Sequence, residues 1–236
     1  MRFAARLLIS AAFLTAGGCL SSPPKTAPPD PTPASAGWRP LFNSRDLSGW
    51  APLGTAHWRV QDDAILGTQD GDPSRAGLLT TREQFKNFEL YIDFNIEEHG
   101  KYNSGVYLRN EPGSVGQTGY QVNIGRGIVG EYSGGIYRKG WLSKGDLNDV
   151  IRRPGTWNTL YIVADGPHIV VELNGVRVAD YTETDPDPKL VAPGVIALQT
   201  YGREPPRLGQ VPQRQGPRVA GIGSTGHRIF HVIRPR

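Results

Sequence analysis

Apolar and polar residues alternate along much of the chain, and such alternation is typical of β-strands. In residues 88–96, Phe, Leu, Ile, Phe and Ile occupy every second position, and Glu, Tyr, Asp and Asn fall between them. A period of two directs one set of side chains to each face of a strand, so that one face can be buried while the other stays polar. The pattern therefore predicts a strand whose apolar face belongs to a core.

The same alternation recurs in shorter runs and predicts further strands in residues 104–109, 119–124, 156–164, 168–173, 176–181 and 194–200. Asn174 and Gly175 separate two of these runs, and both tolerate the positive φ that a two-residue hairpin turn requires. No stretch has a convincing helical period, and the 236 residues include 30 glycines and 20 prolines. These features predict an all-β fold, a β-sandwich or jelly roll, over residues 38–236.

The first 37 residues have a different composition and are expected to precede the folded domain. A basic start, an apolar run in residues 7–14 and small residues at 16–18 indicate a signal peptide, predicted as residues 1–18. The apolar run is far shorter than the ~20 residues that a helix needs to cross a bilayer. We therefore expect an exported protein that does not span the membrane.

Cys19 is the only cysteine, and it directly follows the small residues, as the lipidated cysteine of bacterial lipoproteins does. Residues 19–37 then contain six prolines, which favour an extended, semi-rigid spacer. We predict a lipid anchor at Cys19 that holds the domain at the outer membrane, within the cell envelope. The alternative is a signal peptide cleaved nearby, which would leave a thiol without a role.

The distribution of charge and the spacing of the histidines argue against nucleic-acid binding and against a metal site. The formal net charge is +4, but residues 201–236 hold seven arginines against the single acid Glu204, so the basic character belongs to this segment. Its composition is that of a solvated loop, with contacts to anionic headgroups or glycans as the alternative, and it offers only Tyr201 and Phe230 as the stacking aromatics that a nucleic-acid reader needs. The five histidines show no metal-ligand spacing, so neither a metal nor another cofactor is predicted.

Outward-facing positions of three predicted strands supply a candidate site. Their side chains are planar amides, tyrosine rings, a carboxylate and a guanidinium, which suit sugar hydroxyls and ring faces. Outward residues of neighbouring strands lie side by side, so we expect one shared surface. The alternative is the ordinary solvent face of a sandwich, which the pattern fits equally well. The residues of the candidate surface are Tyr91, Asp93, Tyr107, Arg109, Gln121 and Asn123.

Several short motifs occur in a fixed order along residues 38–200. They include Leu41-Phe-Asn-Ser-Arg-Asp-Leu-Ser-Gly-Trp50, Asn103-Ser-Gly-Val-Tyr-Leu-Arg109, Gly119-Tyr-Gln-Val122 and Gly155-Thr-Trp-Asn158. Taken together, the chain resembles the 3-keto-disaccharide hydrolase domain family. The resemblance implies a concanavalin A-like jelly roll and an exported enzyme that acts on 3-keto-glycosides.

The resemblance also implies a chemistry. A ketone at C3 of a sugar acidifies the hydrogen at C2, so that a general base can remove this proton, the glycosidic oxygen leaves C1, and water adds back. Arg109 would hold the developing enolate oxygen. The residues that would orient hydroxyls or stack on a ring are Tyr91, Tyr107, Gln121, Asn123, Tyr137 and Trp141.

The chain departs from the family at the predicted base. Members commonly read Tyr-Glu-x-Gln-x-x-Asp, where this chain reads Tyr120-Gln-Val-Asn-Ile-Gly-Arg126, so that both acids are absent. The base would then be Asp93 or Glu131, unless catalysis has been lost. Three functions stay open: a hydrolase or lyase of 3-keto-glycosides, a non-catalytic carbohydrate-binding module of the cell envelope, and a structural envelope protein.

Overall fold

The computed structural model describes residues 38–68, 76–96, 103–125 and 130–200, together with the backbone of residues 232–235. The predicted signal peptide (residues 1–18), the linker with Cys19 (residues 19–37) and most of the basic C-terminal segment lie outside the described residues. The one helix of the described part is neither long nor apolar enough to cross a membrane.

Within the described residues the chain forms fifteen strands and one short helix, α1 (Pro188–Val191). The strands are β1 (Arg39–Pro40), β2 (Trp50–Gly54), β3 (His57–Gln61), β4 (Ala64–Thr68), β5 (Gly77–Phe85), β6 (Phe88–Phe94), β7 (Ser104–Asn110), β8 (Tyr120–Ile124), β9 (Ile136–Tyr137), β10 (Trp141–Ser143), β11 (Asn158–Asp165), β12 (His168–Leu173), β13 (Val176–Thr182), β14 (Gly194–Thr200) and β15 (Val232–Pro235).

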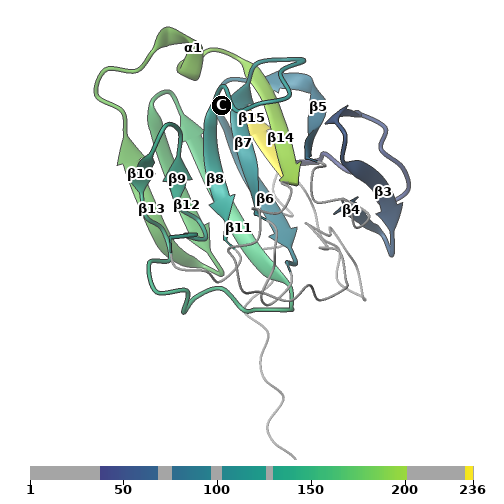
Figure 1. Ribbon diagram of the computed structural model, residues 1–236. Helices are drawn as coiled ribbons and strands as arrows, with labels where there is room; N and C mark the ends of the chain where they lie inside the picture. Colours follow the sequence, from purple (N-terminus) through teal and green to yellow (C-terminus); the bar gives the residue numbers. More distant parts are fainter. Residues whose placement is uncertain (1–37, 69–75, 97–102, 126–129, 201–231, 236) are drawn as a thin grey trace, which may run out of the picture. The chain divides into compact units, whose positions relative to one another are not determined.

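Two antiparallel sheets make up the fold (Figure 1). Sheet A has the strand order β1-β15-β6-β11-β12-β13, and sheet B has the order β10-β9-β8-β7-β14-β5-β2. Strands β3 and β4 form a separate hairpin. The predicted all-β sandwich is confirmed, and each run of alternating residues that predicted a strand is a strand, namely β6, β7, β8 and β11 to β14.

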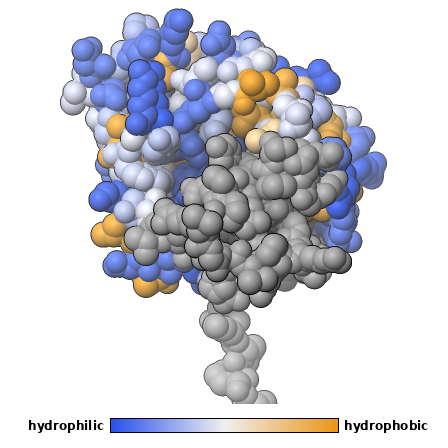
Figure 2. Space-filling view, viewed as in Figure 1, coloured by the Kyte–Doolittle hydropathy of each residue, from blue (hydrophilic) through white to orange (hydrophobic). Residues whose placement is uncertain are grey.

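The core lies between the two sheets. In β6, every second side chain from Phe88 to Phe94 is at most 2% exposed, and the apolar positions of β8 and β11 are buried in the same way. These side chains pack into one cluster that joins both sheets. Each buried large apolar side chain stabilises the fold by about 1.5–3 kcal/mol. The part of the surface drawn in colour in Figure 2 is, by contrast, mainly hydrophilic.

The hairpin turn between β12 and β13 forms where the sequence predicts it. Asn174 and Gly175 both have positive φ, +51° and +79°. The Asn174 side chain also binds the neighbouring chain: its Oδ1 accepts from the backbone N–H of Thr159 at 2.9 Å, and its Nδ2 donates to the backbone oxygen of Ile151 at 2.8 Å. An asparagine therefore supplies both the turn geometry and a link to the loop that precedes β11.

Candidate functional site

The outer face of sheet B carries a row of aromatic and amide side chains. Cross-strand pairing aligns Tyr107 of β7 with Gln121 of β8, Gln121 with Tyr137 of β9, and Tyr137 with Trp141 of β10. The residues that flank Tyr107 and Gln121 along their strands belong to the core between the sheets, so the row faces away from sheet A. The structure thus brings together four of the predicted site residues.

A second row holds a network of amides. Gln199 of β14 pairs with Gly105, and Gly105 pairs with Asn123. Gln121 Nε2 donates to Gln199 Oε1 at 3.0 Å and to Asn123 Oδ1 at 3.1 Å, and Asn123 Nδ2 donates to the backbone oxygen of Tyr132 at 3.3 Å. Within the described residues, Gln121 Oε1 and Gln199 Nε2 make no hydrogen bond. One acceptor and one amino group of the network therefore have no hydrogen-bond partner among the described residues, and the two side chains are 6% and 8% exposed.

Gly105 makes room for this network. A Cβ at this position would lie 2.5 Å from Gln121 Nε2 and 3.0 Å from the backbone oxygen of Val122. A side chain on residue 105 would therefore displace the Gln121 amide from its place across β7. The glycine of the Asn103-Ser-Gly motif thus has a steric role in the site.

Three aromatic rings border the amide network. The Trp141 ring lies at 4.9 Å from the Tyr132 ring and at 5.2 Å from the Tyr137 ring, both edge to face. Lys144 Nζ lies 5.7 Å from the centroid of the Tyr132 ring. The rings are partly exposed. Such an aromatic group offers ring faces and edges against which the apolar side of a sugar can pack.

Glu131 lies on the sheet B side of the molecule. Its carboxylate accepts a hydrogen bond from Asn103 Nδ2. Asn103 stands two residues before Gly105, so it belongs to the same face of the chain that leads into β7. Of the two acids predicted as candidate bases, Glu131 is therefore the one beside the amide network.

Tyr91 and Asp93 lie on the outer face of sheet A, and the prediction that they share a surface with Gln121 and Asn123 is wrong. Thr159 Oγ1 donates to Asp93 Oδ1 at 2.6 Å, and the Tyr91 hydroxyl donates to Thr159 Oγ1 at 3.5 Å. Strand β6 pairs with β11 and β15 of sheet A, so the whole core separates these side chains from the outer face of sheet B.

Arg109 does not follow the alternation that predicted it beside Tyr107 on the outer face. Strand β7 contains one extra residue at this point, because Leu108 and Arg109 together lie opposite Ile196 of β14. The φ of Arg109 is +54°, in the left-handed region, as in a β-bulge. The bulge changes the side on which every later residue of the strand projects, and the arginine turns inward.

Arg109 is only 3% exposed, and its guanidinium donates to two backbone carbonyls. Its Nε donates to the backbone oxygen of Lys86, and its Nη1 donates to that of Leu190 at 3.2 Å. The guanidinium carbon lies 5.9 Å from the ring centroid of Phe88, a core residue. Burial lowers the pKa of Arg109. The predicted contact with an enolate oxygen on the outer face is therefore wrong, because the charge is directed into the end of the sandwich.

Sequence reasoning missed Gln199, Tyr132 and Asn103. Gln199 follows the buried Leu198, so the alternation of residues 194–200 already indicates that it faces outward. Tyr132 and Asn103 lie in irregular segments that carry no such period. Their place in the site could not be predicted from the pattern.

Other parts of the described structure offer less chemistry. No group of His, Cys, Asp and Glu side chains in the described residues could hold a metal ion. A surface cleft of about 300 Å³ lies along β1, β5 and residues 41–49, and none of the predicted site residues lines it.

Comparison with known proteins supports a link to carbohydrates. The family model of the 3-keto-alpha-glucoside-1,2-lyase-like domain matches residues 37–207. No curated protein matches the chain.

Solved structures share the fold at low sequence identity. Two candidate glycosyl hydrolases from Parabacteroides distasonis have TM-scores of 0.57 and 0.55 at 17% and 20% identity. They cover 85% and 84% of this chain, and 94% and 99% of their own. The exoplasmic/lumenal domain of VIP36, in a form bound to Ca²⁺ and Man3GlcNAc, has a TM-score of 0.52 at 12% identity, and the match covers 81% of this chain and 86% of that one.

Proposed function

Because the chain belongs to the 3-keto-alpha-glucoside-1,2-lyase-like domain family, we propose that it is an exported hydrolase or lyase that cleaves 3-keto-glycosides on the outer face of sheet B. The observation that carries this proposal is the convergence, on one face, of three amides, three aromatic rings and the Glu131 carboxylate. Amides and rings supply contacts for hydroxyls and ring faces, and the carboxylate supplies a base.

In the proposed reaction, Glu131 removes the C2 proton of a sugar whose C3 is a ketone. The electrons of the broken C–H bond pass to the C3 oxygen as an enolate and then form a C1–C2 double bond as the C1–O bond breaks, and the leaving oxygen takes up a proton from water. Water then adds across the double bond and gives the free 3-keto-sugar. A well-placed general base contributes about 10²- to 10⁴-fold to such a rate.

The developing negative charge on the C3 oxygen needs a donor. Since Arg109 is buried and bound to backbone carbonyls, the Gln199 Nε2 amino group takes this role in our proposal. The Tyr132, Tyr137 and Trp141 rings hold the sugar, and the Gln121 carbonyl accepts from one of its hydroxyls.

A second candidate function is carbohydrate binding without turnover. It is favoured by Gln121, which stands where family members commonly have a glutamate. An amide at this position keeps the hydrogen-bonding capacity of the face but cannot serve as a base.

The test is incubation of the purified protein with 3-keto-disaccharides of several linkages and with their unoxidised parents. We expect free sugar from a 3-keto-disaccharide alone, and a 10²- to 10⁴-fold lower kcat for Glu131→Gln. Asp93→Asn is the matched control, because it removes the same charge on the opposite sheet, and its kcat should stay within about twofold of the wild-type value. Sugar binding by calorimetry without release in any linkage would reject catalysis and support the binding function.

A further inference from the structure

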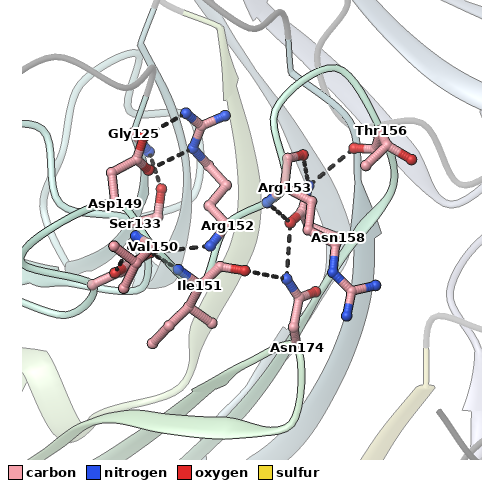
Figure 3. Close-up of polar contacts among 11 residues, drawn as sticks. Gly125, Ser133, Asp149, Val150, Ile151, Arg152, Arg153, Thr156, Asn158 and Asn174 are labelled. Atoms are coloured by element: carbon pink, nitrogen blue, oxygen red, sulfur yellow. Dashed lines mark hydrogen bonds and ion pairs between the residues drawn. The ribbon is translucent and has the colours of Figure 1, made fainter.

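A buried carboxylate organises the loop between β10 and β11. Asp146 is 3% exposed, and its side chain accepts three backbone hydrogen bonds. Oδ1 accepts from the N–H of Val150 at 3.0 Å, and Oδ2 accepts from the N–H groups of Ile151 and Arg152 at 2.9 and 3.0 Å. In Figure 3 the amides of these three residues face the same point. The loop conformation therefore depends on one carboxylic side chain.

The same residue is bound to the segment that carries two site residues. The Asp146 N–H donates to the backbone oxygen of Ser133 at 2.8 Å, in an isolated β-bridge. Ser133 directly follows residues 131–132 and is itself fixed, because its Oγ accepts from the N–H of Gly125 at 3.1 Å. Gly145 allows the close approach, since a Cβ there would lie 2.5 Å from the Ser133 oxygen. The position of the Glu131 segment thus depends on the loop that Asp146 holds.

The other half of the loop has a separate anchor. Asn158 is 1% exposed; its Oδ1 accepts from the Arg153 N–H at 2.7 Å and from Asn174 Nδ2 at 2.9 Å. Its Nδ2 donates to the backbone oxygens of Arg153 and Thr156 at 2.8 and 2.9 Å (Figure 3). These partners connect the loop to the hairpin turn of sheet A. Asn158 and Asp146 therefore have similar burial and similar numbers of partners, but their bonds reach different parts of the fold.

We infer that Asp146 is a positioning residue for the reaction proposed above, on which this inference rests. Its carboxylate fixes the loop through residues 150–152, its backbone N–H holds Ser133, and the adjoining residues present the Glu131 carboxylate and the Tyr132 ring to the sugar. An asparagine in its place would oppose an amino group to one of the backbone N–H groups, so that the loop would shift. A misplacement of about 1 Å at a reacting group can lower a rate by about 10²-fold.

The activity test compares Asp146→Asn with Asn158→Asp, the reverse exchange at the second anchor. Both variants should have lower thermal midpoints than the wild type. We expect a roughly 10- to 100-fold lower kcat on the 3-keto-disaccharide for Asp146→Asn and a kcat within about twofold of wild type for Asn158→Asp. In a Glu131→Gln background, Asp146→Asn should lower kcat by a much smaller factor, because the reacting group that it positions is already gone and only the Tyr132 ring is left to misplace. Equal losses in both backgrounds, or equal losses for the two anchors, would show a merely structural role.

A second readout does not depend on catalysis. Asp146→Asn should speed amide hydrogen exchange in residues 131–135 and leave the hairpin turn at Asn174 protected, and Asn158→Asp should do the reverse. Unchanged exchange in residues 131–135 would overturn the inference even in an active enzyme. If the wild type releases no sugar, the proposed function fails. Amide hydrogen exchange then still tests whether Asp146 fixes residues 131–135. If Asp146→Asn does not fold, Asp146→Glu replaces it in both measurements. This variant keeps the carboxylate and moves it by one methylene.

Discussion

The two outer faces of the sandwich are built on the same alternation, but their polar side chains have different partners. On sheet A, carboxylates are bound to hydroxyls: Tyr161 donates to Glu89 at 2.7 Å, and Thr159 donates to Asp93 at 2.6 Å. On sheet B, amides bind one another across Gly105, and two of their polar atoms have no hydrogen-bond partner among the described residues. The comparison shows that a polar face is a candidate site because of the partners its groups have, and not because of its polarity.

The faces also differ in how the space over their strands is filled. The sheet A face fills the space over its strands with tyrosine and threonine hydroxyls that reach the acids beside them. The sheet B face contains a glycine in its second row, and the space that a Cβ would take there is filled by the Gln121 side chain.

Among substitutions that test the difference between the two faces, Gly105→Ala should have the largest effect on stability and sugar affinity. The added Cβ would meet Gln121 Nε2 at 2.5 Å and displace the amide that links Gln199 to Asn123. We expect the free energy of unfolding to fall by about 1–3 kcal/mol, as for other overpacked sites. Sugar affinity, measured by calorimetry, should fall about tenfold or more, because two amides lose their common donor.

Gly140→Ala is the matched control, because no atom lies within 4 Å of a Cβ at that position. Its unfolding free energy and sugar affinity should both stay close to the wild-type values. If Gly105→Ala binds sugar as tightly as Gly140→Ala does, the amide network has no part in recognition.

A smaller and purely structural effect is expected on sheet A. Tyr161→Phe removes the hydroxyl that donates to Glu89, so the free energy of unfolding in urea should fall by about 1 kcal/mol. Turnover and sugar affinity should not change, because the core separates this face from sheet B. A tenfold loss of turnover in this variant would show that function depends on the outer face of sheet A, and would contradict the proposed site on sheet B.

The smallest effect concerns alkaline stability at the edge of sheet A. Burial and the hydrogen bond to Glu183 raise the pKa of Tyr181 to about 12, from an ordinary value of 10.0. Between these values the unfolded chain loses the phenolic proton while the folded protein keeps it, so the free energy of unfolding should decrease as the pH rises from about 10 to about 12. Tyr181→Phe should make the urea midpoint less dependent on pH in this window. An unchanged slope in the variant would assign the decrease to other groups.

The sequence predicted the strands well because burial of one face imposes a period of two on the residues themselves. It also predicted the hairpin at Asn174 and Gly175, since few residues adopt that turn. It could not predict which sheet contains a strand: Asp93 and Gln121 have the same pattern, and only the pairing of β6 with β11 separates them.

The pattern of residues also does not indicate that Arg109 departs from the alternation. A β-bulge inserts one residue without changing the composition of the strand, and every expectation based on alternation fails beyond it. The sequence indicates Glu131 only by its charge, because the segment around it has no period. Its place near Asn103 follows from the loop that Asp146 organises, which is a tertiary feature.

The two hydrogen bonds from the Arg109 guanidinium to backbone carbonyls have a consequence for the order in which the protein folds. Its two carbonyl acceptors, on Lys86 and Leu190, are 23 and 81 residues away along the chain. Contacts between such distant residues require the closure of long loops, whose entropic cost is met only when the intervening strands have paired. We therefore expect the end of the domain at α1 to close late, and a chain that stopped before Leu190 would bury this guanidinium with one acceptor missing.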